Sequence, residues 1–353
     1  MTTPRDNLLR TLRRQGFETV PLDISMCPSQ VEAFKKRFGH DDYLSWFKVP
    51  HRFAGVPMNP GYRDGRALYR RETLPEGASI DVFGVGHSAQ PGCYHMTRMH
   101  HPLAGEPSLQ EVLDYPMPEP APDAEKQVKA HADEVHAQGL AVMGGMACTI
   151  WEIAWYIRSM EGLMTDMMTD DERASAHFDK IMRNGILRVK VYAKAGVDII
   201  QLGDDIGMQG SIMMSTELWR KWIKPRTAAI IRAGREIKPD LLFFYHSCGF
   251  ITPFIEELIG IGIDILNPVQ PECMDFDEVH KLVRGRASFW GTIGTQSTLP
   301  FGTPDDVRAV VRSRLDRCGK DGGIVIAPTH LVEPEVPWEN IEAMAEAARE
   351  YRG

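Results

Sequence analysis

From residue 123 to the C-terminus, short apolar segments alternate with longer amphipathic segments, and this alternation limits the possible folds more than any other feature of the sequence. Strands that alternate with helices form parallel sheets with right-handed crossover connections. Six such units follow a first predicted strand, which fits a closed (β/α)8 barrel better than an open sheet. The predicted strands after residue 123 are 139–145, 197–205, 241–246, 263–268, 287–291 and 323–328. The predicted helical segments are 123–137, 150–196, 216–238, 254–259, 277–283, 303–318 and 338–351.

The first 122 residues are less regular. A short basic helix is predicted at 6–15, a first strand at 20–24 and a helix at 34–44. Residues 51–122 are rich in Gly, Pro, Tyr and Arg and contain few periodic segments, so we interpret them as a decoration of the barrel rather than as an independent domain. The whole chain, 1–353, is therefore predicted to be one α/β domain, a single (β/α)8 TIM-type barrel with N-terminal decorations in 1–122.

The composition disfavours several classes of function. A formal net charge of −8 argues against nucleic-acid binding, because nucleic-acid phosphates select basic surfaces. No apolar run reaches the roughly 18 residues of a membrane span, and the polar N-terminal segment does not resemble a secretory signal. The six cysteines are scattered, which fits reduced thiols better than a disulfide framework. We therefore expect a cytoplasmic protein without a nucleic-acid or membrane partner.

Reactive side chains follow the predicted strands directly. In (β/α)8 barrels the active site lies at the carboxyl ends of the strands, where the loops that follow the strands meet. Core packing alone does not explain why several separate strands all end in reactive side chains. The sequence therefore predicts a catalytic barrel with these residues at its mouth: Asp204, Asp205, His246, Cys248, Asn267 and His330.

His246 and Cys248 are the strongest metal-site candidates. Side chains alternate between the faces of a strand, so the imidazole and the thiol project to the same side, just before Gly249 permits a turn. An imidazole beside a thiol makes half of a zinc site; the alternative is a structural cysteine next to a core histidine. Glu152 lies in an apolar segment and is a further candidate ligand, because a buried carboxylate needs a partner. The alternative for Glu152 is an exposed helix glutamate.

Two carboxylates follow the strand 197–205. Because neighbouring residues alternate faces, at most one of Asp204 and Asp205 is expected to point fully into the pocket, where it would contact substrate or handle a proton. The alternative for this pair is a cap or turn before Gly207. Four further polar residues are expected to line the pocket, His87 as a catalytic group and the others as substrate-orienting groups: His87, Gln209, Tyr245 and Asn267.

Several segments of the chain resemble the uroporphyrinogen decarboxylase superfamily, and the resemblance covers nearly the whole length. The segments are 83–87, 101–103, 115–118, 203–205 with Gln209 and Ser215, 246–249, and 327–330 running on to 337–341. True decarboxylases of this superfamily carry Arg-Gln-Ala-Gly-Arg near the N-terminus, where the arginines bind the propionates of the substrate. The corresponding segment here, Leu-Asp-Ile-Ser-Met-Cys at 22–27, contains no arginine.

The other branch of the superfamily contains zinc methyltransferases of corrinoid-dependent methyl transfer. These proteins share the His-x-Cys pair at the end of a central strand, and many add a third cysteine after the last strand, where this chain has His330. The resemblance implies a zinc site formed by His246 and Cys248, with His330 and Glu152 as further ligand candidates. For His330, the alternative is a hydrogen-bonding contact to the substrate.

The resemblance further implies transfer of a methyl group from a small O- or N-methylated substrate to a corrinoid (cobalamin) carried by a partner protein. Transfer from a methylated corrinoid to a thiol is the reverse direction, and the missing third cysteine favours demethylation of the small substrate. Two alternatives remain: a metal-free decarboxylase of a tetrapyrrole-like polycarboxylate, and a non-catalytic barrel that binds a ligand or a corrinoid protein. The oligomeric state is left open, with a homodimer as one option.

Overall fold

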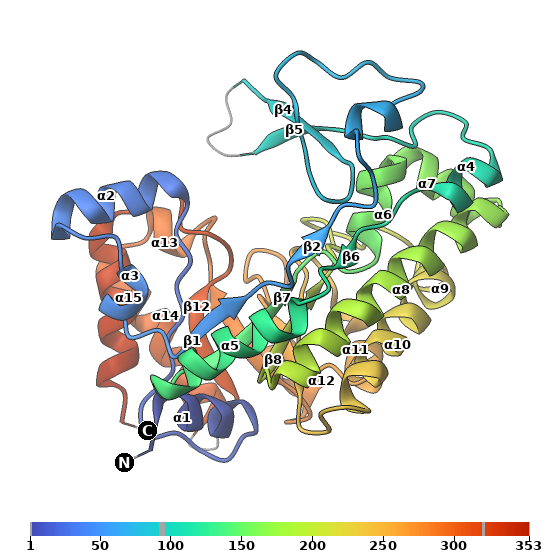
Figure 1. Ribbon diagram of the computed structural model, residues 1–353. Coiled ribbons are helices and arrows are strands. Elements are labelled where there is room, and N and C mark those ends of the chain that lie inside the picture. Colours follow the sequence, from blue (N-terminus) through green and yellow to red (C-terminus); the bar gives the residue numbers. More distant parts are fainter. Residues whose placement is uncertain (1, 92–95, 320–321, 353) are drawn as a thin grey trace.

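A computed structural model describes residues 2–91, 96–319 and 322–352, and its centre is a curled, parallel, seven-stranded sheet (Figure 1). The strand order is β1-β7-β8-β9-β10-β11-β12. The strands span His51–Ala54 (β1), Ala141–Met146 (β7), Ile199–Gly203 (β8), Leu242–His246 (β9), Ile265–Asn267 (β10), Ser288–Ile293 (β11) and Ile324–Pro328 (β12). Sequential parallel strands joined by helices confirm the predicted (β/α)8-type architecture.

The N-terminal side of the barrel differs from the prediction. The expected strand at 20–24 is present only as isolated bridges from Leu22 to Ile326 and from Met26 to Val332, which place this segment beside β12. Strand β1 lies in 51–122, which we interpreted as decoration, and this interpretation is wrong for residues 51–54. His51 to Ala54 pair in parallel register with β7 and form part of the barrel wall. Four residues that include a charged Arg52 are too few to show a strand pattern in the sequence.

Helices cover the outside of the sheet. The crossover layer consists of α5 (Ala124–Ala137), α6 (Trp151–Arg158), α7 (Met160–Met168), α8 (Glu172–Ala195), α9 (Thr216–Trp222), α10 (Lys224–Arg235), η2 (Thr252–Phe254), α11 (Ile255–Gly260), α12 (Phe276–Val283), α13 (Thr298–Phe301), α14 (Pro304–Cys318) and α15 (Trp338–Glu350). The predicted helix 216–238 is divided into α9 and α10, because Pro225 starts a new helix. The N-terminal helices are α1 (Pro4–Leu12), α2 (Pro28–Phe38) and α3 (Tyr43–Trp46). Helix α2 lies about six residues before its predicted position: it starts at Pro28 and ends at Phe38, and Gly39 with φ 80° caps its C-terminus.

The remaining part of the N-terminal region forms small elements outside the barrel. Strands β3 (Ser79–Ile80), β4 (Gly86–Ala89) and β5 (Thr97–His100) make a three-stranded sheet, and β2 (Met58–Asn59) pairs with β6 (Glu119–Pro120). Helices η1 (Gly65–Leu68) and α4 (Leu109–Asp114) complete this region. Figure 1 shows β4 and β5 at the edge of the molecule, well away from the central sheet. None of the described helices is long and apolar enough to span a membrane.

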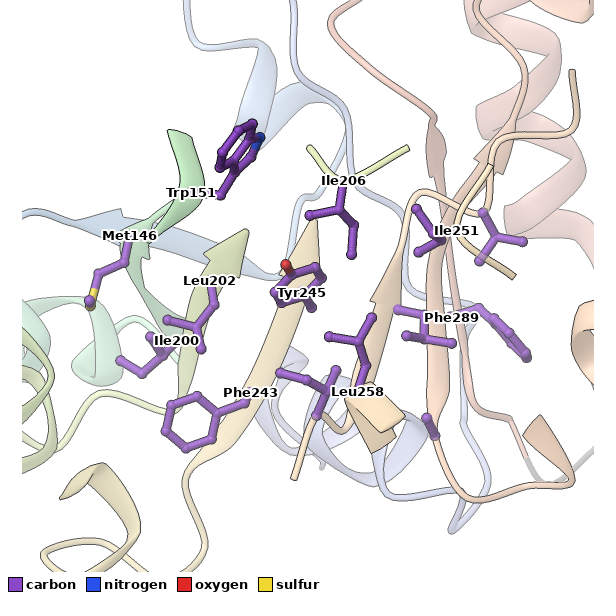
Figure 2. Packing of buried hydrophobic residues seen from close by; sticks show 14 of the residues in the cluster. Met146, Trp151, Ile200, Leu202, Ile206, Phe243, Tyr245, Ile251, Leu258 and Phe289 are labelled. Atoms are coloured by element: carbon purple, nitrogen blue, oxygen red, sulfur yellow. The ribbon is translucent and has the colours of Figure 1, made fainter. Parts of the chain in front are cut away.

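Successive side chains of a strand point to opposite faces of the sheet, and each face borders a different hydrophobic core. Leu242 and Phe244 point to the inside of the barrel, where leucines of α1 close the end opposite to the strand carboxyl termini. Phe243 and Tyr245 point outward into the core between sheet and helices (Figure 2). His246 continues the inward series, so the last residue of β9 faces the barrel mouth.

Candidate active site

Three side chains lie together at the barrel mouth: His246 ends β9, and Asp205 and Cys248 lie in the loops after β8 and β9. One ligand atom each of Asp205, His246 and Cys248 lies within 4.8 Å of the others. His246 Nε2 is 3.5 Å from Cys248 Sγ and 3.7 Å from Asp205 Oδ1. The backbone N–H of Cys248 also donates to Asp205 Oδ1 at 2.8 Å. The group contains a sulfur, a nitrogen and an oxygen donor, which are the three ligand types that zinc takes in proteins.

Close packing of two glycine-containing loops brings these side chains together. Gly249 has φ 81°, a left-handed conformation that glycine adopts readily, and it turns the chain directly after Cys248. A Cβ atom on Gly207 would lie 2.8 Å from the carbonyl oxygen of Cys248. Phe250 N–H donates to Met208 O at 2.8 Å, so the loops after β8 and β9 contact each other through their backbones. A side chain at position 207 would therefore force apart the two loops that carry Asp205 and Cys248.

Asn267 fixes the orientation of the His246 ring. The Asn267 side-chain amide donates from Nδ2 to Trp290 O at 2.7 Å, and its Oδ1 faces His246 Nδ1. With Nδ2 committed as a donor, Oδ1 accepts a hydrogen bond from Nδ1–H of the histidine. This tautomer leaves the lone pair of Nε2 directed at Cys248 and Asp205, as a metal-binding histidine requires. Asn267 was expected to orient substrate, and the structure makes it a partner of His246 at the wall of the cavity.

Glu152 lies beside this group, in the first turn of α6. Its Oε1 accepts a hydrogen bond of 2.9 Å from Tyr156 Oη. Burial, followed by the negative charge of Asp205, raises the pKa of Glu152, while His246 opposes that rise. Glu152 is not a member of the three-residue group found in the described part of the chain, but it is the carboxylate next to it.

Asp204 lies on the other side of the strand end and holds the start of α6. It is fully buried and accepts backbone N–H groups of Ile150 at 3.1 Å and Glu152 at 2.9 Å. An anion at a helix N-terminus satisfies amides that have no partner within the helix. Burial raises the pKa of Asp204, and the backbone donors oppose that shift. The structure thus turns only Asp205 of the pair toward His246, and Asp204 positions the helix that carries Glu152.

Of three further expected residues, Tyr245 and His87 lie away from the site, and Gln209 lines the second cavity together with Cys248. Tyr245 faces away from the cavity, because a strand directs neighbouring side chains to opposite faces and His246 points inward. Figure 2 shows its ring beside Leu202 and Ile206 in the outer core. The expectation that Tyr245 contacts the substrate is therefore wrong. His87 pairs with Asp81 at 3.2 Å and Thr97 at 2.9 Å in the small sheet, away from the residues that line the cavity. Gln209 donates to Gln296 at 3.1 Å on the rim of a second cavity.

Two cavities meet at His330. The main cavity, of about 240 Å³, is lined by Asp23, Ser25, Phe53, Met143, Ala147, Gln201, Phe244, His246, Asn267, Trp290, Ala327, Pro328, Thr329, His330 and Leu331. The second cavity, of about 420 Å³, is lined by Gly207, Met208, Gln209, Cys248, Gly249, Gln270, Thr295, Gln296, Thr329, His330, Leu331, Glu333 and Glu335. His246 faces the first and Cys248 the second, so the three-residue group lies where the cavities meet. The His330 ring centroid is 6.3 Å from that of His246.

Asp23 was not among the expected site residues. It belongs to the segment 20–26 and is the one aspartate or glutamate among the residues that line the main cavity in the described chain. No lysine or arginine occurs in that same lining. The sequence did carry a signal: Asp23 interrupts an apolar run that we predicted to be a barrel strand.

The residues present fit a zinc ion. Burial and the negative charge of Asp205 raise the pKa of the Cys248 thiol, so a cation is needed to favour its thiolate. His246 already has its donor nitrogen turned toward Asn267 and its acceptor nitrogen toward the thiol. The group could therefore bind a metal without a change of tautomer.

Comparison with known proteins gives related enzymes of two kinds. Residues 97–351 match the family model "Uroporphyrinogen decarboxylase (URO-D)". Methylcobamide:CoM methyltransferase MtaA of Methanosarcina barkeri is 24% identical over 211 residues, and the match covers 60% of this chain and 58% of that protein. The chain thus spans less than two thirds of that relative.

The uroporphyrinogen decarboxylase of Legionella pneumophila (strain Lens) is 24% identical over 358 residues and covers 97% of this chain and 96% of that protein. The solved structure of a methyltransferase from Methanosarcina mazei superposes with a TM-score of 0.69 at 16% identity and 99% coverage of both chains, which shows the shared fold. The match to the family model confirms the resemblance seen in the sequence. This chain belongs to the uroporphyrinogen decarboxylase family.

Proposed function

We propose that this protein is a zinc-dependent methyltransferase that moves a methyl group from a small O- or N-methylated compound to a corrinoid carried by a partner protein. The observation that carries the proposal is the group of Asp205, His246 and Cys248, in which the hydrogen bond to Asn267 leaves the lone pair of His246 Nε2 directed at the other two side chains. Among the similar proteins, methylcobamide:CoM methyltransferase MtaA supports methyl transfer that involves a corrinoid.

His246, Cys248 and Asp205 would hold the metal, and Glu152 and His330 are the candidates for a further position. A bound zinc ion would act as a Lewis acid on the methylated oxygen or nitrogen of the substrate. In the proposed reaction, cobalt(I) of the partner's corrinoid would supply the electron pair of the new bond to the methyl group and become cobalt(III), while the C–O or C–N bond would break and the leaving oxygen or nitrogen would keep the bonding electrons and take up a proton. The main cavity would hold the substrate beside His246, and the second cavity gives access from the side of Cys248.

The lining of the main cavity argues against a polycarboxylate decarboxylase. A tetrapyrrole with several carboxylates needs cationic partners, because unpaired charges are costly to remove from water. The described lining offers Asp23 and no lysine or arginine. The second cavity, which meets the main cavity at His330, likewise has no lysine or arginine in its described lining. Both linings favour a substrate that is not a polyanion.

The test is methyl transfer to a reduced corrinoid, measured for the wild type and two cysteine variants. Cys248→Ala should reduce methyl transfer to background, because it removes the sulfur ligand. Cys318→Ala is the matched control, since this thiol lies in α14, away from both cavities, and it should leave the rate unchanged. Full activity of Cys248→Ala would contradict the proposal. Absence of turnover in the wild type with any O- or N-methyl donor would favour a non-catalytic barrel.

A further inference from the structure

Three side chains of the small sheet and its neighbouring loop form a hydrogen-bonded chain outside the barrel. Ser88 Oγ lies 2.9 Å from Nε2 of His100, and Nδ1 of the same histidine lies 2.6 Å from Oε1 of Glu72. Because a carboxylate only accepts hydrogen bonds, the histidine donates from Nδ1–H to Glu72 and accepts at Nε2 from the Ser88 hydroxyl. A hydroxyl, an imidazole and a carboxylate connected in this order are the nucleophile, base and orienting group of serine hydrolases.

The pairing of β4 with β5 places the serine and the histidine on one face of the small sheet. Gly86 lies opposite His100 and Ser88 lies opposite Arg98, so these four residues share a face. Ser88 is therefore the diagonal neighbour of His100, within reach of its long side chain. A Cβ atom at Gly86 would lie 3.2 Å from the Cβ atom of His100, so the glycine leaves room for the imidazole.

The base is buried, whereas the nucleophile lies toward the open end of this face. The His100 side chain is 4% exposed and the Glu72 side chain is 33% exposed. Tyr69 Oη lies 2.9 Å from the carbonyl oxygen of His100 and holds the backbone of the histidine. Ser88 is partly exposed and Arg98 is exposed. The imidazole is thus fixed in one tautomer and orientation, and a small molecule can approach the hydroxyl from solvent.

Arg98 brings a positive charge to the same end of the face. It lies directly opposite Ser88, and the Cβ atoms of such a pair are about 4.5–5.5 Å apart. Among the described residues, no aspartate or glutamate forms an ion pair with Arg98. A guanidinium beside the serine can stabilise the negative charge that develops on a carbonyl oxygen when the hydroxyl attacks the carbonyl carbon.

We propose that Ser88, His100 and Glu72 form a second catalytic site that hydrolyses small carboxylic esters, with Arg98 as the oxyanion-stabilising group. Ser88 Oγ bonds to the ester carbonyl carbon while its proton passes to His100 Nε2. The C–O bond to the alcohol breaks, and the alcohol leaves with that proton. Water then attacks the acyl carbon and gives a proton to His100, which returns it to Ser88 Oγ as the carboxylic acid leaves. This site is independent of the proposed methyl transfer.

An ester is the substrate class that suits this geometry. Hydrolysis of an ester requires only the nucleophile, the base and the oxyanion stabiliser, because an alcohol leaves more readily than an amine. The partly exposed serine offers few further contacts that would hold a longer chain such as a peptide in place. A small ester needs no such contacts.

A fluorophosphonate tests the site on the full-length protein, because this reagent bonds covalently to a serine that is activated by a neighbouring base. Peptide mass spectrometry should find the label on Ser88, and Ser88→Ala should lose it. Ser79→Ala is the matched control, because it removes an exposed serine of the same small sheet for which the described structure shows no histidine partner. The control should be labelled like the wild type and should hydrolyse p-nitrophenyl acetate at the same rate.

His100→Gln separates a catalytic histidine from one that only holds the small sheet together. The part of p-nitrophenyl acetate hydrolysis that Ser88→Ala removes should fall by about 100-fold or more in His100→Gln, the usual effect of losing a general base. Glu72→Gln is the second variant if His100→Gln does not fold, since it keeps the shape of the side chain and removes its charge. It should slow the labelling of Ser88.

Three results would overturn the proposal. The first is a folded wild type in which Ser88 is not labelled. The second is labelling of Ser88 at the wild-type rate in folded His100→Gln or Glu72→Gln. The third is loss of the label after treatment with a metal chelator, because the three residues are not members of the group Asp205, His246 and Cys248 and should react without a metal.

Discussion

At the scale of single residues, the group at the barrel mouth depends on neighbours that are not members of the proposed metal site. Asn267 sets the tautomer of His246, and Asp204 holds the N-terminus of α6 and therefore Glu152. Sequence reasoning placed His246 and Cys248 on one face, and the structure brings their side chains to 3.5 Å. It assigned Tyr245 to the same pocket, although the same alternation puts Tyr245 on the opposite face. Asn267 contacts His246 because β10 lies beside β9 in the sheet. A short segment of sequence does not show which strands are neighbours, so this contact could not be predicted.

Asn267→Leu should weaken zinc binding by about 10- to 100-fold, the usual effect of losing a partner that orients a metal-binding histidine. The leucine offers no acceptor to His246 Nδ1–H, so the ring is free to rotate. Competition with a chromophoric chelator measures the affinity. Gln296→Ala, which breaks only the pair with Gln209, should bind zinc like the wild type. An unaltered zinc affinity in Asn267→Leu would show that the His246 orientation does not depend on Asn267.

The resemblance to the zinc methyltransferases places His330 where many of them carry a third cysteine. If His330 is a ligand, the metal has one thiolate rather than two, receives less charge from sulfur and polarises a bound ether or amine more strongly. His330→Cys should then retain zinc but slow demethylation, and His330→Ala should weaken zinc binding. Zinc retention and methyl transfer to a reduced corrinoid are measured for each variant. If His330→Ala keeps its zinc affinity, His330 is a substrate contact and the preference for demethylation loses its main support.

At the scale of elements, the site depends on backbone contact between the loops after β8 and β9. The strands from β7 to β12 were predicted from the alternation of apolar and amphipathic segments, because each strand is buried on both faces and has a clear apolar run. β1 was missed because it has four residues, and the strand expected at 20–24 is reduced to isolated bridges. The approach of the two loops could not be predicted, because glycines at 207 and 249 are equally consistent with ordinary turns.

Gly207→Ala should weaken zinc binding by about tenfold or more, because its methyl group would lie 2.8 Å from the carbonyl oxygen of Cys248 and push the loops apart. Gly210→Ala is the matched control in the same loop, since its methyl group would meet no atom within 4 Å. Zinc affinity and the thermal unfolding midpoint are measured for both. Equal zinc affinities for the two variants would mean that the loop contact does not position the ligands.

At the scale of the whole molecule, the hydrophobic cores and the site are separate. The inner core consists of strand residues with leucines of α1, and the outer core lies between sheet and helices. Asp205, His246 and Cys248 lie beyond the carboxyl ends of the strands and contribute little to either core. The fold class was therefore predictable from the apolar pattern, whereas the charge of the cavity lining depends on Asp23, which lies far from His246 in the sequence.

Removal of the metal should therefore leave the protein folded. After treatment with a chelator, the far-ultraviolet circular dichroism spectrum should be unchanged and unfolding should remain cooperative, with a lower midpoint that returns when zinc is added, because the metal binds the folded state. Methyl transfer should fall to background and recover with zinc. Loss of the circular dichroism signal on chelation would show that the metal is a structural element of the barrel.

The central claim is that zinc binds at Cys248, His246 and Asp205, and X-ray absorption spectroscopy at the zinc edge tests it most directly. The wild type should show one sulfur at about 2.3 Å and the remaining ligands as nitrogen or oxygen at about 2.0–2.2 Å. The sulfur signal should disappear in Cys248→Ala and persist in Cys318→Ala. A protein purified without chelators that contains no zinc, or a zinc ion with no sulfur ligand in the wild type, would contradict the claim.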